Sequence, residues 1–270
     1  TVQYGVRYDS VLTPMAPDTN VNFVKEYGFS NASKFDFEVL QPRFSFNMNV
    51  SESLFGNSDR VVAATLRGGR GLFMGRIPRV WYGNAYSRTG ATGDYRGWFS
   101  FDETASNFPG YMPVGSDPTA FWLTPPSKYV VPDGNNPYGV AQSTDPNFEA
   151  PSSWRTAIAL DMITQGGWDV TLEYNLDQVR QAVFFRDLGH YKKTTLADGR
   201  GVYGGRGDYN LTNTEEGATE AWTISAFKEF GDIKWYAGYT NMRATDIFEL
   251  TSAQSESSYG RSVRADGENI

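Results

Sequence analysis

Alternation of apolar and polar residues is the feature that most constrains what this sequence can fold into. Apolar residues occupy every second position from Trp168 to Leu176, and polar residues fill the positions between them. Successive side chains of a β-strand point to opposite faces, so this pattern predicts a strand with one apolar and one polar face. About seven segments alternate in this way, most of them roughly 9–13 residues long, whereas globular strands average about five or six. We therefore predict an all-β chain with long strands.

The links between the predicted strands are alternately short and long. The short links cover residues 51–60, 165–167 and 231–232, and the long ones cover 10–41, 75–153 and 187–218. Soluble domains rarely hold structureless loops beyond about 12–15 residues. Outer-membrane barrels combine tight turns on one side with long loops on the other. This spacing predicts a segment of an antiparallel transmembrane β-barrel with long extracellular loops.

Tryptophans mark both ends of the predicted strands. Trp154 and Trp222 begin strands after long links, while Trp168 and Trp235 begin strands after short turns. An indole prefers the boundary between lipid and water, so this placement favours two aromatic girdles. The residues expected to face lipid are Phe44, Phe46, Met48, Trp154, Leu160, Trp168, Leu172, Tyr174, Trp222 and Trp235.

The alternation by itself leaves a second architecture open. The strands of a soluble β-sandwich also have one apolar and one polar face, and their apolar faces meet in a shared dry core. In that case the four tryptophans would be ordinary core residues. Strand length, the asymmetry of the links and the tryptophan positions together favour lipid over a second sheet.

Composition narrows the function classes. The chain has no cysteine and one histidine, which excludes disulfides, thiolate metal sites and polyhistidine sites. A formal net charge of −7 argues against a nucleic-acid partner. Carboxylates on the predicted polar faces, such as Asp161 and Glu173, are expected to line a wet lumen beside arginines. We therefore expect no enzymatic activity.

Several motifs resemble those of one membrane-protein family. The stretch from Leu66 to Gly90, LRGGRGLFMGRIPRVWYGNAYSRTG, is similar to a strand end and loop of TonB-dependent outer-membrane receptors of the Oar type, which carry a carboxypeptidase-regulatory-like domain. Four further segments resemble family motifs in the same order: Gln41–Phe46, Asp145–Thr156, Leu211–Gly217 and Asp246–Gln254.

The resemblance implies a function and a set of partners. Such receptors form closed barrels of about 22 strands around a plug and move a bulky ligand across the bacterial outer membrane, driven by the TonB complex. No segment of this chain resembles a plug, a TonB box or a C-terminal assembly strand, so we expect it to be a stretch from the middle of a larger receptor. Its expected partners are outer-membrane lipid, the TonB complex through the plug, and an extracellular ligand or surface protein.

Chemistry-bearing residues are concentrated in the longest link. Arg76 and Arg79 are expected either to bind an anionic group or to tie the loop base to neighbouring strands. The oxygen-rich turn at Pro132–Pro137 suggests calcium within residues 75–153, although turn chemistry alone explains it; we expect no other cofactor or metal. The candidate ligand or loop contacts are Arg76, Arg79, Trp81, Asn84, Trp122 and Tyr129.

Two further function classes remain open at this point. One is a cell-surface adhesion or interaction protein whose long loops bind other proteins. The other is a secreted soluble β-sandwich, either a lectin or a hydrolase. A soluble β-sandwich would remain in solution without detergent, which distinguishes it from a membrane barrel.

Overall fold

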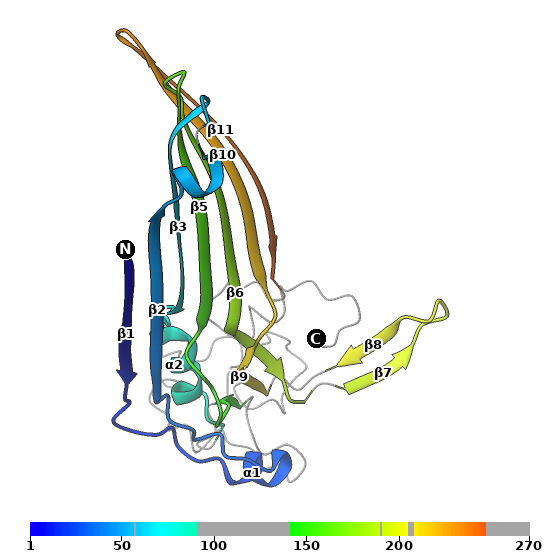
Figure 1. The fold of residues 1–270 in the computed structure, drawn as a ribbon. Helices are drawn as coiled ribbons and strands as arrows, with labels where there is room; N and C mark the ends of the chain where they lie inside the picture. Colours follow the sequence, from blue (N-terminus) through cyan, green and yellow to red (C-terminus); the bar gives the residue numbers. More distant parts are fainter. Residues whose placement is uncertain (57, 91–140, 190, 205–207, 247–270) are drawn as a thin grey trace, which may run out of the picture.

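The structure is a computed structural model that describes residues 1–56, 58–90, 141–189, 191–204 and 208–246. Nine strands form one sheet, and seven of them follow one another in chain order with antiparallel pairing (Figure 1). The seven are β1 (Val2–Val11), β2 (Phe37–Asn49), β3 (Val61–Met74), β5 (Ser152–Thr164), β6 (Asp169–Asp187), β10 (Ala218–Phe230) and β11 (Ile233–Thr245). The prediction of a mostly β chain with antiparallel strands is confirmed.

Strand pairing keeps the predicted alternation in register across the sheet. One row of paired residues on the first face is Leu66, Leu160, Leu172 and Ile224. The adjacent row, on the opposite face, is Arg67, Ala159, Glu173 and Thr223. A shift by one residue in any strand would exchange its two faces. The sheet therefore has an apolar face and a polar face that each run across all seven strands.

Short and long links lie at opposite ends of this sheet (Figure 1). The β5–β6 and β10–β11 turns place Gly167 and Gly231 at φ values of 71° and 60°, a conformation that suits glycine. The β2–β3 link contains a short π-helix, η1 (Ser51–Phe55). The other links between neighbouring strands of the seven are long, and they leave and re-enter the sheet at the opposite end (Figure 1).

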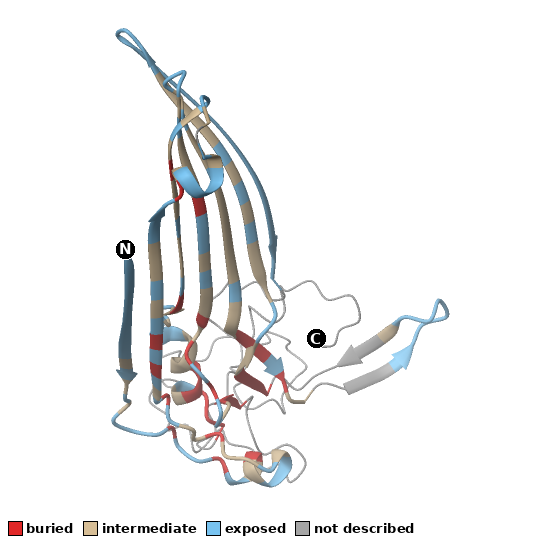
Figure 2. Cartoon of the chain, viewed as in Figure 1, coloured by how far each residue is buried: buried red, intermediate tan, exposed pale blue. Residues whose placement is uncertain are grey.

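The described sheet is open, and its apolar face is covered only in part, at its long-link end where Trp154 packs against Leu72 and Ala150. Among the described strands, β1 pairs only with β2, and β11 only with β10. Every residue of β11 is exposed (Figure 2). Large apolar side chains also remain accessible within the sheet, with Leu172 at 41% and Trp222 at 57%. No second sheet packs against this face in the described part of the chain.

The long connections contain secondary structure of their own. β2 begins at Phe37, within the predicted 10–41 link, and the links hold α1 (Val21–Tyr27), α2 (Arg79–Ser87), β4 (Gln142–Thr144), β7 (Tyr191–Thr195), β8 (Gly201–Gly204) and β9 (Tyr209–Thr214). β7 and β8 form a separate hairpin. Across the described residues, no helix combines the length and apolar character needed to cross a bilayer.

The end of β6 carries the sheet into these connections. Its residues Ala182–Asp187 pair with β9, which also pairs in parallel with β4. We call the described long connections together with Ala182–Asp187 the cap. Alternation stops here, because Val183, Phe184 and Phe185 are all buried and the strand is covered on both faces.

The cap has its own hydrophobic core at the long-link end of the sheet, where most of the buried residues lie (Figure 2). Phe35 stacks on Tyr82 with ring centroids 4.1 Å apart, and Phe148 lies 5.3 Å from Phe35. Phe185 and Leu211 complete the buried cluster from β6 and β9. Residues from all three long links thus meet in one core.

Buried polar side chains join the same three links. Asn20 caps α1, and its Nδ2 also donates to the Thr89 carbonyl at 3.1 Å. The Tyr27 hydroxyl donates to Asp208 Oδ2 at 2.6 Å. Because Asn20 is almost fully buried, its hydrogen bonds replace solvent contacts that it has lost.

Asp36 ties the end of β1 to the start of β2. Its Oδ1 accepts hydrogen bonds from the Thr13 backbone N–H at 2.6 Å and from the Thr13 hydroxyl at 2.8 Å. The backbone hydrogen bond is the main reason that the pKa of Asp36 lies below its ordinary value of 3.8. The carboxylate form is therefore the one that holds this junction.

We predict that the Asp36 tie is present at neutral pH and is lost in acid. A folded-state pKa below the unfolded one gives stabilisation that is complete above the unfolded pKa and disappears as the pH falls through the folded value. The Thr13 amide chemical shift should titrate with a midpoint below 3.8, and Asp36→Asn should abolish that titration. A midpoint at or above the ordinary value would contradict the hydrogen-bonding scheme.

Glycines in β3 permit close contact with the strands on both sides. A Cβ atom at Gly68 would lie 2.9 Å from the Ala157 carbonyl oxygen and 2.9 Å from Ile158 Cγ1. The segment is a paired strand rather than a phosphate-binding loop, since Gly68 and Gly69 lie opposite Ile158 and Ala157. The run of glycines therefore serves packing.

We predict that Gly68→Ala destabilises the fold. A methyl group forced against a backbone carbonyl should lower the free energy of unfolding by about 1–3 kcal/mol. The control is Gly5→Ala, where a Cβ meets no atom within 4 Å and the change should be within about 0.5 kcal/mol. Urea unfolding followed by tryptophan fluorescence measures both, and equal effects would refute the packing argument.

Candidate functional site

The polar face of the sheet contains a hollow of about 890 Å³. We call it the polar hollow. The side chains of the polar face that line it include Arg43, Arg67, Phe73, Arg155, Asn175 and Asp177. They come from β2, β3, β5 and β6, so the hollow exists only when these four strands are paired in register. Positive and negative groups are both present.

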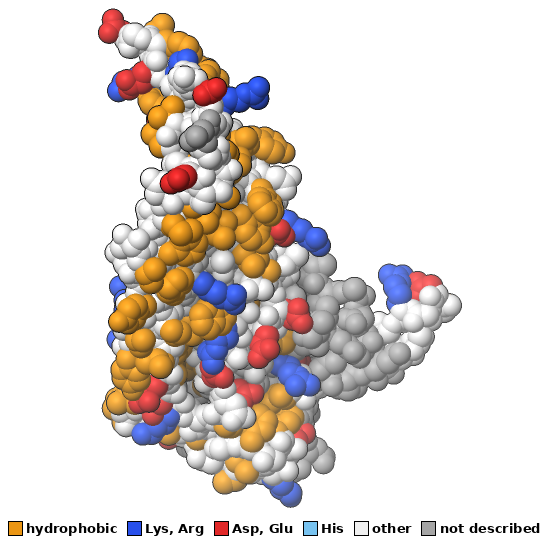
Figure 3. Space-filling model, viewed as in Figure 1, with side chains coloured by type: hydrophobic (Ala, Val, Ile, Leu, Met, Phe, Trp, Pro, Cys, Tyr) orange, Lys and Arg blue, Asp and Glu red, His pale blue; other side chains and the backbone are white. Residues whose placement is uncertain are grey.

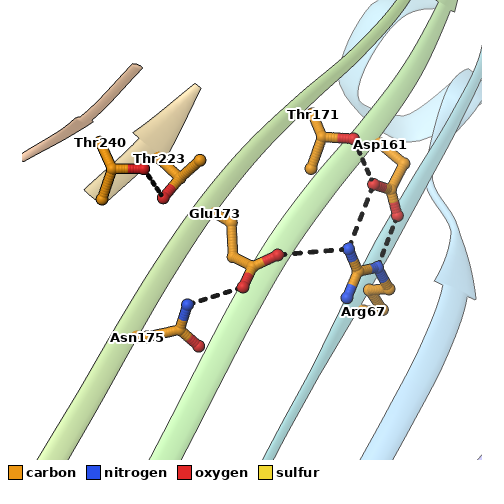
Figure 4. A network of polar contacts seen from close by, with 7 residues as sticks. All are labelled: Arg67, Asp161, Thr171, Glu173, Asn175, Thr223 and Thr240. Carbon is orange, nitrogen blue, oxygen red and sulfur yellow. Dashed lines mark hydrogen bonds and ion pairs between the residues drawn. The ribbon is translucent and has the colours of Figure 1, made fainter. Parts of the chain in front are cut away.

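Arg67 is at the centre of an ionic network at one side of the polar hollow (Figure 4). Its Nε lies 2.7 Å from Asp161 Oδ2, and its Nη2 lies 3.5 Å from Glu173 Oε2. The Thr171 hydroxyl donates to Asp161 at 2.8 Å, and Asn175 Nδ2 donates to Glu173 at 2.6 Å. Both carboxylates are thus engaged by the arginine and by a neutral donor.

A second cluster consists of Arg43, Phe73 and Arg155, and we call it the arginine–phenylalanine cluster. The guanidinium carbon of Arg43 lies 4.4 Å from the centre of the Phe73 ring, and that of Arg155 lies 5.6 Å from it. Arg155 Nε also forms an ion pair with Asp177 Oδ2 at 2.9 Å. A Cβ at Gly71 would lie 3.0 Å from both Arg43 and Phe73, so the absence of a side chain there makes room for the cluster.

Polar contacts continue towards β1. The Gln41 side chain is 2% exposed, donates to Asp9, and accepts the Met74 backbone N–H at 3.0 Å. Asp9 also pairs with Arg7 at 2.8 Å. These contacts connect β1, β2 and β3, the strands on one side of the polar hollow.

The apolar face carries paired aromatic rings. Trp168 and Trp235 pack edge to face with centroids 5.1 Å apart, and the Lys228 ammonium lies 5.2 Å from the centre of the Trp168 ring. Tyr174 and Trp222 lie 4.3 Å apart. Hydrophobic side chains form a broad band over the sheet in Figure 3. Pairing register and these ring contacts place all ten residues predicted to face lipid on this one face.

The predicted contact residues after β3 do not converge on one site. Arg76 and Arg79 are exposed, and no ion pair joins them to the described residues. Trp81 packs against the hydrophobic core of the cap, together with Tyr82. Asn84 is buried, and its Nδ2 donates to the Val80 and Trp81 carbonyls at 3.1 Å, which gives it a local structural role in α2.

The remaining candidates fall on other parts of the sequence. Trp122, Tyr129 and the suggested calcium turn at Pro132–Pro137 lie outside the described residues. Within the described ranges, no group of three or more metal-ligating side chains is present. Sequence reasoning missed the arginine–phenylalanine cluster, because only pairing register brings Arg43 and Arg155 to Gly71.

A scan against protein-family models finds no match to this chain, and a search of curated proteins finds none either.

We predict that Arg67 and Asp161 stabilise the sheet cooperatively. Exposed ion pairs contribute about 0.2–1 kcal/mol, and this one is partly exposed, so a double-mutant cycle of Arg67→Met and Asp161→Asn should give a coupling energy in that range. Raising the salt to about 1 M should reduce the coupling, because the Debye length then falls to about 3 Å.

The control for this cycle pairs Arg67→Met with Thr240→Val. The Thr240 hydroxyl contacts Thr223 at 2.9 Å, away from the Arg67 network (Figure 4). These two substitutions should be additive within about 0.3–0.5 kcal/mol. Equal coupling in the two cycles would show that the network is not a specific unit.

Proposed function

We propose that this chain forms part of the wall of an outer-membrane β-barrel, with its apolar face towards lipid and its polar face towards a wet lumen. The observation that carries the proposal is the uniform sidedness of seven consecutive strands, with apolar side chains exposed on one face and an ionic network on the other. An exposed apolar surface of this extent is typical of a face that contacts a membrane or another protein. A soluble sandwich would supply a second sheet, and none packs there in the described part of the chain.

The length of the apolar band suits a bacterial outer membrane. In β5 the band extends from Trp154 to Met162, and these eight steps at about 3.3 Å each span about 26 Å along the strand. A tilt of about 35–45° shortens this to roughly 20 Å across the membrane, close to the apolar band of about 25 Å in such barrels.

Side chains at the two ends of the band suit lipid–water boundaries. At the short-link end, Lys228 lies beside Trp168 and Phe230, which allows its stem to remain among apolar groups while the ammonium reaches water. Near the long-link end, Arg70 lies 5.1 Å from the Trp154 ring centre. Aromatic and cationic side chains at both ends support a membrane-spanning arrangement.

The sequence motifs and the link asymmetry support one type of barrel. We infer a receptor or transporter of the TonB-dependent, Oar-like type, in which the cap contributes to the extracellular surface and the polar face lines the transport path. Strands from elsewhere in the receptor would pair with β1 and β11. This chain would supply wall and loops rather than a catalytic site.

We predict that Leu172→Lys impairs membrane insertion. Leu172 lies in the middle of the apolar face, and a lysine near the bilayer midplane costs about 2–4 kcal/mol. The partition constant of the chain between phosphatidylcholine vesicles and water, obtained from flotation in a density gradient, should fall at least tenfold, as about 1.4 kcal/mol corresponds to tenfold.

The matched control is Thr171→Lys, one residue earlier on the polar face. Thr171 lies beside Asp161, which can pair with the new ammonium, so vesicle association should be close to that of the unmodified chain. Equal loss in both variants, or in neither, would defeat the assignment of the two faces.

A further inference from the structure

We propose that the polar hollow binds an organic carboxylate through the arginine–phenylalanine cluster. Arg43, Phe73 and Arg155 come from three adjacent strands, β2, β3 and β5, and their side chains meet above Gly71. All three line the hollow of about 890 Å³. Pockets of about 300–1,000 Å³ are the usual size for small-molecule sites.

Arg43 has hydrogen-bond donors to offer. Among the described residues it contacts the Phe73 ring but forms no hydrogen bond or ion pair, and its Nε is shielded from solvent without a partner. A buried donor left unsatisfied is costly, and an incoming acceptor removes that cost. Arg67, in contrast, already donates to Asp161 and Glu173 through Nε and Nη2.

Arg155 supplies a second source of donors. Its ion pair with Asp177 uses Nε, which leaves its terminal nitrogens for another acceptor. The guanidinium group is a planar fork that binds a carboxylate through two parallel hydrogen bonds. Two such groups beside one phenyl ring therefore offer hydrogen-bond donors to a carboxylate in the hollow.

The local charge favours a monoanion. Arg43 and Arg155 carry two positive charges, and Asp177 cancels one of them. The nearby Asp9 carboxylate is already paired with Arg7 and Gln41. One positive charge remains, which matches a carboxylate better than a phosphate dianion.

The surface around the two arginines also favours a ligand that carries an apolar group. The guanidinium carbons of Arg43 and Arg155 lie 4.4 Å and 5.6 Å from the centre of the Phe73 ring, and Ala157 and Gly69 also line the hollow. The ligand class is therefore a carboxylate joined to an apolar or aromatic group. It comes either from a soluble compound or from an aspartate or glutamate of a protein segment that lies against the polar face.

This inference depends only on the polar face. It holds whether the opposite face meets lipid or protein, so its failure is distinguishable from failure of the proposed function. The vesicle experiment on Leu172 and Thr171 addresses only the latter.

The experiment is a fluorine-NMR titration of the complete 270-residue chain with para-fluorobenzoate. We expect saturable binding, and we expect the neutral isostere para-fluorobenzamide to bind at least about tenfold more weakly, because hydrogen bonds to charged groups are the stronger ones. Arg43→Gln should weaken benzoate binding by at least about tenfold. Arg180→Gln should change it by less than about threefold, since Arg180 does not line the hollow and is paired with Glu149.

A second variant and a measurement of folding distinguish a loss of binding from a folding defect. Arg155→Gln should also weaken benzoate binding, and tryptophan fluorescence confirms that each variant retains the fold of the unmodified chain. Absence of benzoate binding, equal binding of the benzamide, or unchanged binding in folded Arg43→Gln and Arg155→Gln would each overturn the proposal.

Competition then distinguishes the two sources of the carboxylate. The competitors are benzoate and the capped peptide acetyl-Ala-Asp-Phe-amide. Displacement of the fluorinated probe at lower peptide than benzoate concentration assigns the site to a protein segment, and the reverse order assigns it to a soluble ligand. Either result supports a carboxylate site when the same competitor binds Arg43→Gln at least about tenfold more weakly, and equal binding to this variant would overturn the proposal.

Discussion

Backbone pairing in a fixed register is the constraint on which the rest of this structure depends. Each antiparallel step from β1 to β11 places the same class of side chain on the same face, because alternation within a strand has a period of two. The apolar band, the ionic network around Arg67 and the arginine–phenylalanine cluster are all consequences of this one register. None of them exists within a single strand.

The polar face illustrates how the register creates chemistry from separate residues. Arg67 reaches Asp161 and Glu173 across two strand boundaries, while Arg43 and Arg155 approach Phe73 from both neighbours of β3. The glycines of β3 are part of this arrangement, since side chains at Gly68 or Gly71 would occupy space that neighbouring residues fill. Because these glycines have no side chains, the side chains of the neighbouring strands occupy the space above β3.

Local periodicity made the sheet predictable, whereas the cap and the polar cluster depend on contacts between distant residues. The segment Trp168–Leu176 reveals its strand without any knowledge of a partner, and all seven strands were found in this way. In Val183–Phe185 alternation gives way to continuous burial, because β9 and the cap core cover that part of β6. Trp81 and Asn84 were candidates for ligand or loop contacts, and they pack within the cap, which only the fold of the long links reveals. Arg43 was not predicted as a site residue, because no residue near it in the sequence indicates that it contacts Phe73 or lies close to Arg155.

The hydrogen bonds that hold the cap together also affect the order in which the parts of the chain fold. Its hydrogen bonds from Asn20 to Thr89 and from Tyr27 to Asp208 connect positions 69 and 181 residues apart, while the β10–β11 hairpin closes through two residues. Closing a large loop costs more chain entropy than closing a small one, and non-local contacts form slowly. We therefore expect hairpin formation to precede closure of the cap.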